Sequence, residues 1–192
     1  WLDASNNLLV TGCTASSDFP VTAGAFQTTM AGPNISGSFG DAFLAKFNNS
    51  GVQQWTTLIG GSQDEIGYGL CTDPTGEIFL TGYTVSSNFP TSAAAYQSSY
   101  GGGSSDVFFA RFSPAGTRSW STYYGSNGGQ RALDIRYKDN FLYATGYGAG
   151  TLPGPAGSAF QPNNAGGSGD GIIIKLSPNS SAAQVIWRSF CG

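Results

Sequence analysis

The sequence predicts an all-β protein built from about three copies of one unit of four antiparallel strands. The first observation is a repeat, in which a Thr-Gly pair, a proline and an Ala-aromatic-Gln triplet recur at residues 11–27, 81–97 and 145–161. The second is composition, because 29 of the 192 residues are glycine and 14% are aromatic, with short apolar runs between turn formers. The third is that no stretch has the apolar period of an amphipathic helix.

Each copy continues with the same elements in the same order. An aspartate opens an apolar run and a tryptophan closes the unit; these repeated residues are Asp41, Asp106 and Asp170, and Trp55, Trp120 and Trp187. In the second copy we expect strands at residues 78–81, 107–112, 118–124 and 132–137, joined by turns such as the Ser-Pro-Ala-Gly of residues 113–116. The first copy has five extra residues between its Gln and Asp, which indicates a loop that varies on a fixed scaffold.

Four short strands per unit, with an aromatic and a glycine motif in each, are typical of a β-propeller blade. We expect one repeat domain over residues 1–192, with blade-like repeats at about 8–77, 78–141 and 142–192 and with residues 1–7 as the tail of a preceding fourth strand. Closed propellers need about four to eight blades, so three blades form an array that is open at both ends or completed by another chain.

The motifs together resemble the SBBP-type bacterial β-propeller repeat. They are Thr-Gly-Cys-Thr-Ala-Ser-Ser-Asp-Phe-Pro at residues 11–20, Asp-Ala-Phe-Leu-Ala-Lys at 41–46, Asp-Pro-Thr-Gly-Glu at 73–77 and Ser-Thr-Tyr-Tyr-Gly at 121–125. The resemblance covers nearly the whole chain, although the third copy has Leu152-Pro153 in place of Phe-Pro. It implies a prokaryotic scaffold, usually exported or attached to the cell surface, and no particular reaction.

Composition favours a location outside the cell or on its surface, since only 10% of residues are charged and the surface must rely on hydroxyl and amide groups. The net charge of -3, without a Lys/Arg cluster, argues against nucleic acid as a partner. No apolar run approaches the ~20 residues of a membrane span. No signal peptide is visible and the chain opens on Trp1, so we expect a processed or excised segment.

Catalytic chemistry has little support in this sequence. There is no histidine, which excludes Ser-His-Asp and Cys-His systems and His-containing zinc sites. Paired carboxylates of the glycosidase type remain, and the charged residues that break the repeat are the candidates: Asp64, Glu65 and Asp134, with Arg131 and Arg136. The repeated aspartates are interpreted as turn caps that accept backbone N–H bonds. We therefore expect no enzyme, no cofactor and no metal, and we interpret the glycine-rich residues 166–170 as a turn rather than a calcium loop.

The cysteines leave two interpretations open. Cys13, Cys71 and Cys191 are odd in number and form no C-x-x-C pair. Either all three are small buried hydrophobes, or one disulfide within the chain leaves a thiol, that of Cys191, for a neighbouring chain.

Three sequons mark candidate glycosylation sites in loops: Asn34, Asn48 and Asn179. The repeated tryptophans are expected to pack between sheets. Less regular tyrosines, among them Tyr68, Tyr100 and Tyr147, are candidates for an exposed surface on which sugars stack.

The sequence favours a structural or adhesive function, with self-association into a filament or surface layer through exposed blade faces and strand edges. The partner is then either a second copy of the chain or the remaining blades of a longer one. A carbohydrate- or protein-binding module of a larger secreted protein is the alternative, and a carboxylate-dependent enzyme acting on glycans is third.

Overall fold

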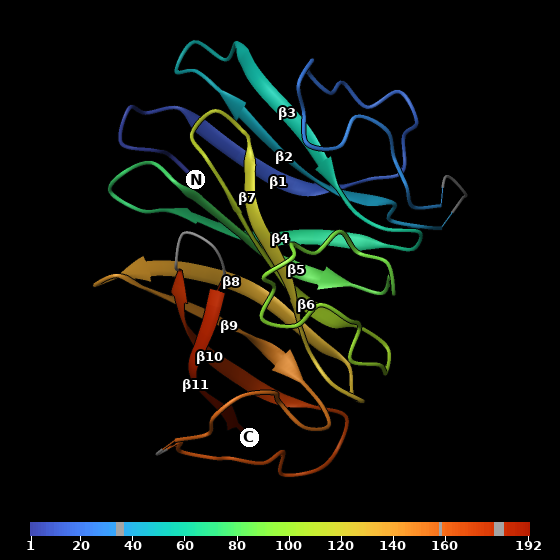
Figure 1. Cartoon of the computed structure of the whole chain (residues 1–192), viewed down its shortest axis with the longest axis vertical. Coiled ribbons are helices and arrows are strands. Elements are labelled where there is room, and N and C mark those ends of the chain that lie inside the picture. The colour runs from blue at the N-terminus through green and yellow to red at the C-terminus, as the bar shows by residue number, and fades with distance from the viewer. Residues whose placement is uncertain (34–36, 158, 179–182) are drawn as a thin grey trace.

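The computed structural model describes residues 1–33, 37–157, 159–178 and 183–192, which form three antiparallel sheets stacked face to face (Figure 1). The elements of sheet 1 are β1 (Leu8–Thr14), β2 (Asp41–Phe47) and β3 (Gln53–Ile59). Those of sheet 2 are β4 (Glu65–Thr72), β5 (Ile78–Thr84), β6 (Asp106–Phe112) and β7 (Arg118–Tyr124). Those of sheet 3 are β8 (Gln130–Lys138), β9 (Phe141–Gly148), β10 (Asp170–Pro178) and β11 (Ala183–Cys191). The predicted all-β class is confirmed, and the sheets are consistent with part of a β-propeller that is not closed.

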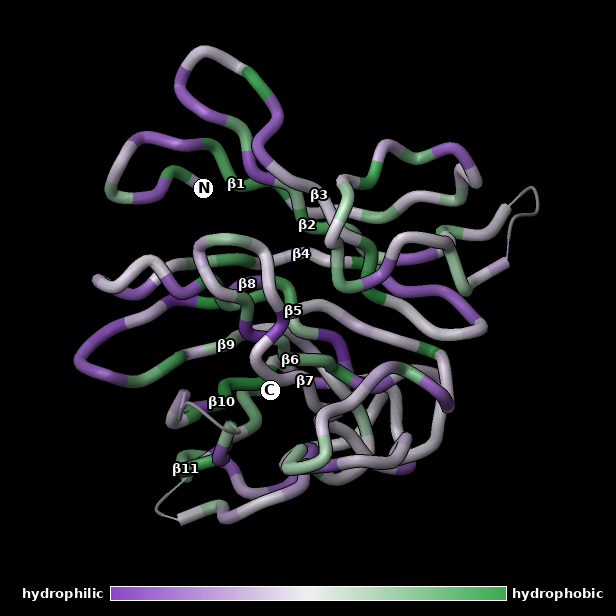
Figure 2. Tube along the Cα trace, turned by 45° about the horizontal axis from the view of Figure 1, so that its top comes forward, coloured by the Kyte–Doolittle hydropathy of each residue, from purple (hydrophilic) through white to green (hydrophobic). Residues whose placement is uncertain are grey.

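Sheet 2 is covered on both faces, which explains why its central strands β5 and β6 are buried along almost their whole length. Side chains alternate between the two faces of a strand, so Phe108 of β6 points toward sheet 1 while Phe109 points toward sheet 3. The apolar segments therefore gather in the strands, and the polar ones lie in the connecting loops (Figure 2).

Two apolar cores hold the stack together. The core at the junction of sheets 1 and 2 (junction 1–2) includes Leu9, Leu44, Ile59, Leu80, Phe108 and Phe112. The core at the junction of sheets 2 and 3 (junction 2–3) includes Phe109, Trp120, Tyr124, Ile135, Ile174 and Phe190. The first strands of the four-stranded sheets, β4 and β8, also contact each other directly, and we call them the inner strands.

The sheets are displaced by one strand from the predicted repeats. Residues 132–137, expected to be the fourth strand of the second repeat, belong to β8, which pairs with β9 and opens sheet 3. In the same way β4 follows β3 in the chain but pairs with β5 of the next sheet. Sheet 3 therefore has four strands, the first of which comes from the second repeat, and the described part of sheet 1 has three. A sequence period gives the length of a unit but does not decide which strands pair.

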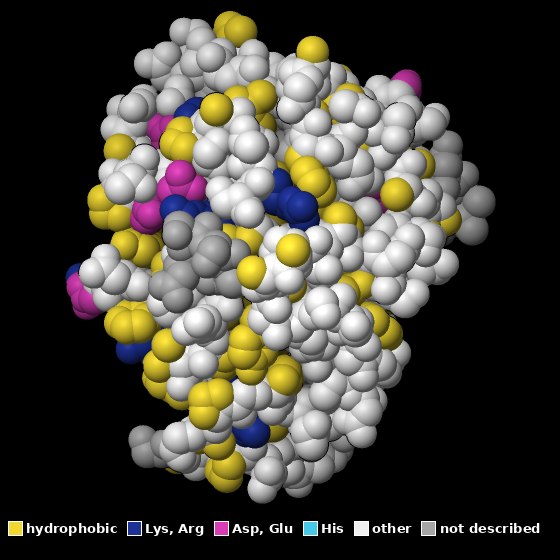
Figure 3. Space-filling model, in the orientation of Figure 1, with side chains coloured by type: hydrophobic (Ala, Val, Ile, Leu, Met, Phe, Trp, Pro, Cys, Tyr) yellow, Lys and Arg dark blue, Asp and Glu magenta, His cyan; other side chains and the backbone are white. Residues whose placement is uncertain are grey.

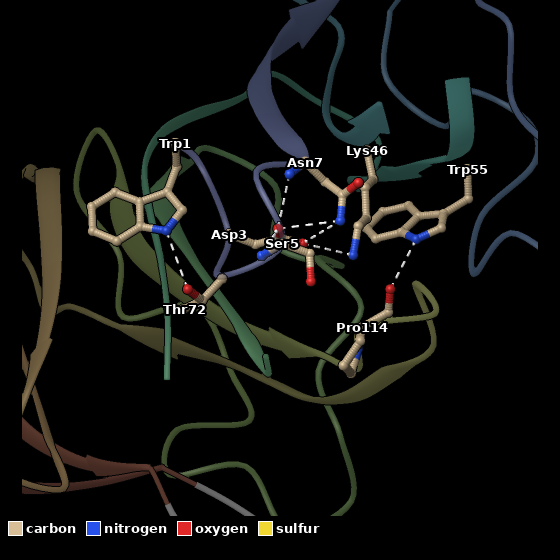
Figure 4. A network of polar contacts seen from close by, with 8 residues as sticks. All are labelled: Trp1, Asp3, Ser5, Asn7, Lys46, Trp55, Thr72 and Pro114. Carbon is tan, nitrogen blue, oxygen red and sulfur yellow. Dashed lines mark hydrogen bonds and ion pairs between the residues drawn. The ribbon is translucent and has the colours of Figure 1, made fainter. Parts of the chain in front are cut away.

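Residues 1–7 form a turn with the same hydrogen bonds as the turn that connects β4 to β5. Leu2 pairs with Leu8, the Leu9 N–H donates to the Trp1 carbonyl oxygen at 2.9 Å, and the Asp3 carboxylate accepts the N–H of Asn7 at 2.9 Å. Asp3 also forms an ion pair with Lys46, and the Trp1 ring reaches Thr72 of sheet 2 (Figure 4). In the described part of the chain, no strand pairs with the rest of the free edge of β1. No helix in this part is long and apolar enough to cross a membrane.

Candidate interaction site at the sheet junctions

A tryptophan of sheet 1 enters a turn of sheet 2. The Trp55 indole Nε1 donates to the Pro114 carbonyl oxygen at 3.1 Å (Figure 4). A Cβ atom on Gly116 would lie only 2.8 Å from the Trp55 ring, and Gly116 has a φ of 84°. The turn therefore requires glycine both for its backbone conformation and for the approach of the ring. We call the β6–β7 turn with its Pro114 carbonyl and Gly116 a Trp socket.

The β2–β3 turn of sheet 1 has the same form without a tryptophan in it. Gly51 has a φ of 78°, and its N–H donates to the Asn48 carbonyl as Gly116 does to Ser113. No described atom lies within 4 Å of a Cβ built on Gly51. Beside this turn is a hollow of about 470 Å³, lined in part by Leu8 and Phe47. Leu8 is 43% exposed, whereas its counterpart Ile78 in sheet 2 is 1% exposed.

The outer face of sheet 3 carries the aromatic side chains that, in the other sheets, pack against the next sheet. A groove of about 480 Å³ is lined by Phe160, Ile173, Ile186, Trp187 and Cys191, among others. Phe160 is 87% exposed. Its counterpart Tyr96 packs against the core of junction 2–3, and the counterpart of Trp187 is the buried Trp120. Apolar side chains also lie scattered over β10 and β11 in the lower part of Figure 3, where charged ones are few.

Each repeated aspartate fastens the long loop of its own repeat to the sheet. Asp41 accepts the N–H groups of Ala31 at 2.9 Å and Gly32 at 2.7 Å, together with the Gln27 side-chain amide. The Gln27 amide oxygen in turn accepts the N–H of Gly60 at 2.9 Å. The same Gln–Asp clasp recurs in the other sheets, as Gln97 with Asp106 and Gln161 with Asp170. These aspartates therefore serve the loop conformation.

Two buried carboxyl groups meet at junction 1–2. Asp41 and Glu65 are both inaccessible to solvent, and a Cβ on Gly60 would lie 2.6 Å from the Asp41 carboxyl carbon and 2.5 Å from a Glu65 oxygen. Burial raises the pKa of Glu65 to about 7, an effect to which the neighbouring Asp41 charge adds, and burial also raises the pKa of Asp41. At junction 2–3 the same position is occupied by Gln130, beside Asp106, whose pKa burial raises to about 6.

The other charged residues that break the repeat do not gather into one site. Asp64 accepts the N–H groups of Phe39 and Gly40, and Asp134 forms an ion pair with Arg136. The Arg131 guanidinium lies 4.1 Å from the centre of the Tyr83 ring. Among the described residues, no group of three His, Cys, Asp or Glu side chains is placed to hold a metal ion.

All three cysteines are free thiols, so the disulfide within the chain is not formed in this structure. Cys71 is buried in the core of junction 2–3, where burial raises its thiol pKa to about 12. Cys13 is half-buried on β1. Cys191 is exposed and lines the groove on sheet 3.

Of the three sequons, Asn34 and Asn179 lie outside the described residues. Asn48 is half-buried in the β2–β3 turn, where its side-chain oxygen accepts the N–H groups of Ser50 and Val52. Among the tyrosines considered for sugar stacking, Tyr68 and Tyr147 are exposed, and Tyr100 is half-buried against the core of junction 1–2.

Comparison with known proteins identifies one of these units. Residues 54–90, from β3 through β4 and β5, match the SBBP family of β-propeller repeats. This chain carries an SBBP-type β-propeller repeat. The matched segment includes Trp55 and crosses junction 1–2, so the repeat as a sequence unit spans parts of two sheets.

The chain is also similar to a distant repeat protein. An uncharacterised WD repeat-containing protein, L264 of Acanthamoeba polyphaga mimivirus, is 26% identical over an alignment of 161 positions that covers 76% of this chain. The chain spans only 12% of that protein's length.

Sequence reasoning missed the residues that distinguish junction 1–2 from junction 2–3. The Trp sockets went unnoticed because Gly51 and Gly116 act through the space they leave. The substitution of Gly129 for the aligned Asp64 was visible in the repeat alignment, and it is the signal that could have indicated a pocket.

Proposed function

We propose that this chain is a structural or adhesive module that acts outside the cell and stacks head to tail with copies of itself. The observation that carries the proposal is the occupied Trp socket at junction 1–2, together with its two unmatched halves at the ends. Trp187 and Phe160 of one copy correspond to Trp55 and Phe26, and the Gly51 turn of another corresponds to the Gly116 turn.

The packing around the occupied socket supports the proposal, because it indicates which side chains the proposed contact would bury. At junction 1–2 the Arg118 guanidinium lies 4.2 Å from the centre of the Phe26 ring, and Phe26 also meets the edge of Phe112. In the proposed contact Phe160 takes the place of Phe26 and Phe47 takes the place of Phe112. Burying exposed aromatic and aliphatic surface provides the driving force.

The proposed contact is heterologous, since the two faces differ. Such a contact closes into a ring or extends as a filament, depending on the rotation per step. The scarcity of charged residues supports a location outside the cell.

Complementary variants test the contact. Phe160→Ser removes an apolar side chain from the outer face of sheet 3, and Leu8→Ser removes one from the outer face of sheet 1. Light scattering after size exclusion measures the mass of the particle. We expect that mass to increase with concentration for the unmodified chain and to stay at the 19.8 kDa of a monomer for each variant. A mixture of the two variants keeps one intact contact and should form dimers only.

Phe39→Ser is the matched control, because Phe39 is an exposed aromatic residue outside both faces and Ser104 occupies its place in the next repeat. This variant should assemble like the unmodified chain. An unmodified chain that stays monomeric at high concentration overturns the proposal, as does a Leu8→Ser variant that dimerises by itself.

A further inference from the structure

The two junctions differ at the point where each inner strand begins. At junction 1–2, Asp64 lies just before β4, and its carboxylate accepts the N–H groups of Phe39 at 3.0 Å and Gly40 at 3.1 Å. A carboxylate supplied by the chain therefore fills this place.

At junction 2–3 the residue before the inner strand is Gly129, which has no side chain. The register that aligns Glu65 with Gln130 also aligns Asp64 with Gly129. The repeated aspartates that open β2 and β6 align Phe39 with Ser104. The backbone here pairs with Ser105, just as the Glu65 N–H donates to the Gly40 carbonyl at junction 1–2, and a pocket of about 310 Å³ remains where no carboxylate is present. Its described lining is Ser104, Ser105, Gly129, Arg131, Tyr147, Ala149 and Ser168.

A cation takes part in lining this pocket. Arg131 stands where sheet 2 has Ile66, and its guanidinium is stacked 4.1 Å from the centre of the Tyr83 ring. No acidic side chain in the described part of the chain lies within ion-pair distance of Arg131. Stacking orients the planar guanidinium while leaving its N–H groups free to bind a carboxylate with two hydrogen bonds.

The other walls suit a ligand rich in hydroxyl groups. Ser104 and Ser168 are exposed and supply hydroxyl donors and acceptors, and the Tyr147 ring is 43% exposed. An exposed aromatic ring beside hydroxyl groups can stack on the apolar face of a sugar. The net charge of -3 gives the chain no general attraction for anions, so the recognition must be local.

We propose that this pocket binds an acidic sugar residue of the uronic acid type. Arg131 holds the sugar carboxylate, Ser104 and Ser168 bind sugar hydroxyls, and Tyr147 supports one face of the ring. The carboxylate occupies the region that the Asp64 side chain fills in the preceding repeat. A single copy of the chain contains the whole site, so the proposal does not depend on assembly.

Two substitutions that copy the preceding repeat test the site. Gly129→Asp installs the missing carboxylate; its Cβ would approach the Ser104 Oγ, at the free end of a side chain that can rotate away. Arg131→Ile copies Ile66 and removes the cation. With oligogalacturonate as the probe in titration calorimetry, we expect binding to vanish in Gly129→Asp and to weaken at least about tenfold in Arg131→Ile.

Arg136→Ile is the matched control, since Arg136 lies on the same strand and is already paired with Asp134. It should bind as the unmodified chain does, and a neutral galactose oligomer should not bind. If neither Gly129→Asp nor Arg131→Ile changes the affinity, or if only a poly-glutamate peptide binds, the sugar proposal is wrong. Arg131→Ile tests the proposal even if Gly129→Asp fails to fold.

Discussion

Junctions 1–2 and 2–3 have the same scaffold but different residues where the inner strand begins. Both retain the Gln–Asp clasp and the repeated tryptophan. At three successive positions, however, Asp64, Glu65 and Ile66 of the first junction are replaced by Gly129, Gln130 and Arg131 in the second. The comparison separates residues that build the stack from residues free to specialise, and it locates the specialised ones at the entrance of the inner strand.

The exchange of Glu65 for Gln130 shows what the common site requires. The Gln130 amide accepts the N–H of Ser126 at 2.9 Å and donates to the Ala149 carbonyl. Glu65 likewise accepts the N–H of Gly61 at 2.9 Å. A buried position next to an aspartate favours a neutral group, and a protonated Glu65 meets that requirement as an amide does.

The largest expected difference between the junctions lies in their tryptophans. Trp120 is 1% exposed, and Trp120→Ala should lower the free energy of unfolding by about 3–5 kcal/mol. Trp55 is half-buried, so Trp55→Ala should cost only about 1–2 kcal/mol. Urea denaturation in a Phe160→Ser background measures both, and equal losses would contradict the difference between the two junctions.

The second prediction concerns pH. The Glu65 pKa rises from 4.5 unfolded to about 7 folded, so the folded state holds the proton more tightly. The contribution of Glu65 to stability is therefore largest below pH 4.5, falls as the pH rises from 4.5 to 7, and is lower by roughly 3 kcal/mol above pH 7.

Glu65→Gln removes this contribution by copying Gln130. The variant should be more stable than the unmodified chain above pH 7 and should lose less stability between pH 4.5 and 7. Thermal unfolding at pH 5 and pH 8 provides the measurement. A pH dependence unchanged in Glu65→Gln would show that Glu65 is ionised when folded.

The third prediction compares the occupied and open Trp sockets. Gly116→Ala meets both a positive φ and the Trp55 ring, so it should destabilise the fold by about 2–3 kcal/mol. Gly51→Ala has the same backbone strain with nothing described in its way, and it should cost about 1 kcal/mol. If monomer denaturation gives the same loss for both, the ring does not occupy the Gly116 turn in solution.

The smallest effect is one of rate rather than stability. Alkylation of the folded chain should modify exposed Cys191 first, half-buried Cys13 more slowly, and Cys71 only when junction 2–3 opens. Mass spectrometry of timed samples gives the order. Cys71 reacting as early as Cys13 would mean that junction 2–3 opens readily.

Much of the scaffold could be predicted from the sequence, because it depends on residues that recur. The strand expected at 118–124 coincides with β7, and the strand expected at 78–81 is the first part of β5. The strand expected at 132–137 is also a strand, but its sheet was wrong. Pairing across a crossover depends on packing that a local pattern does not contain.

The candidate sites were harder to predict. Gly51 and Gly129 line their hollows because they have no side chain. A hollow of this kind can be recognised only when the positions of the neighbouring elements are known. The repeated Trp residues were found readily, but the difference between Trp55 in its socket and Trp187 at an open face depends on which sheet follows.

The Gln–Asp clasp has a practical consequence for engineering. Gln27 and Asp41 bond to each other and to the ends of the strands, and the five extra residues of the first copy fall between them. Loop length is thereby uncoupled from sheet geometry. A foreign epitope grafted between these residues should be displayed without changing the scaffold, and the clasps of the other two sheets provide further graft points.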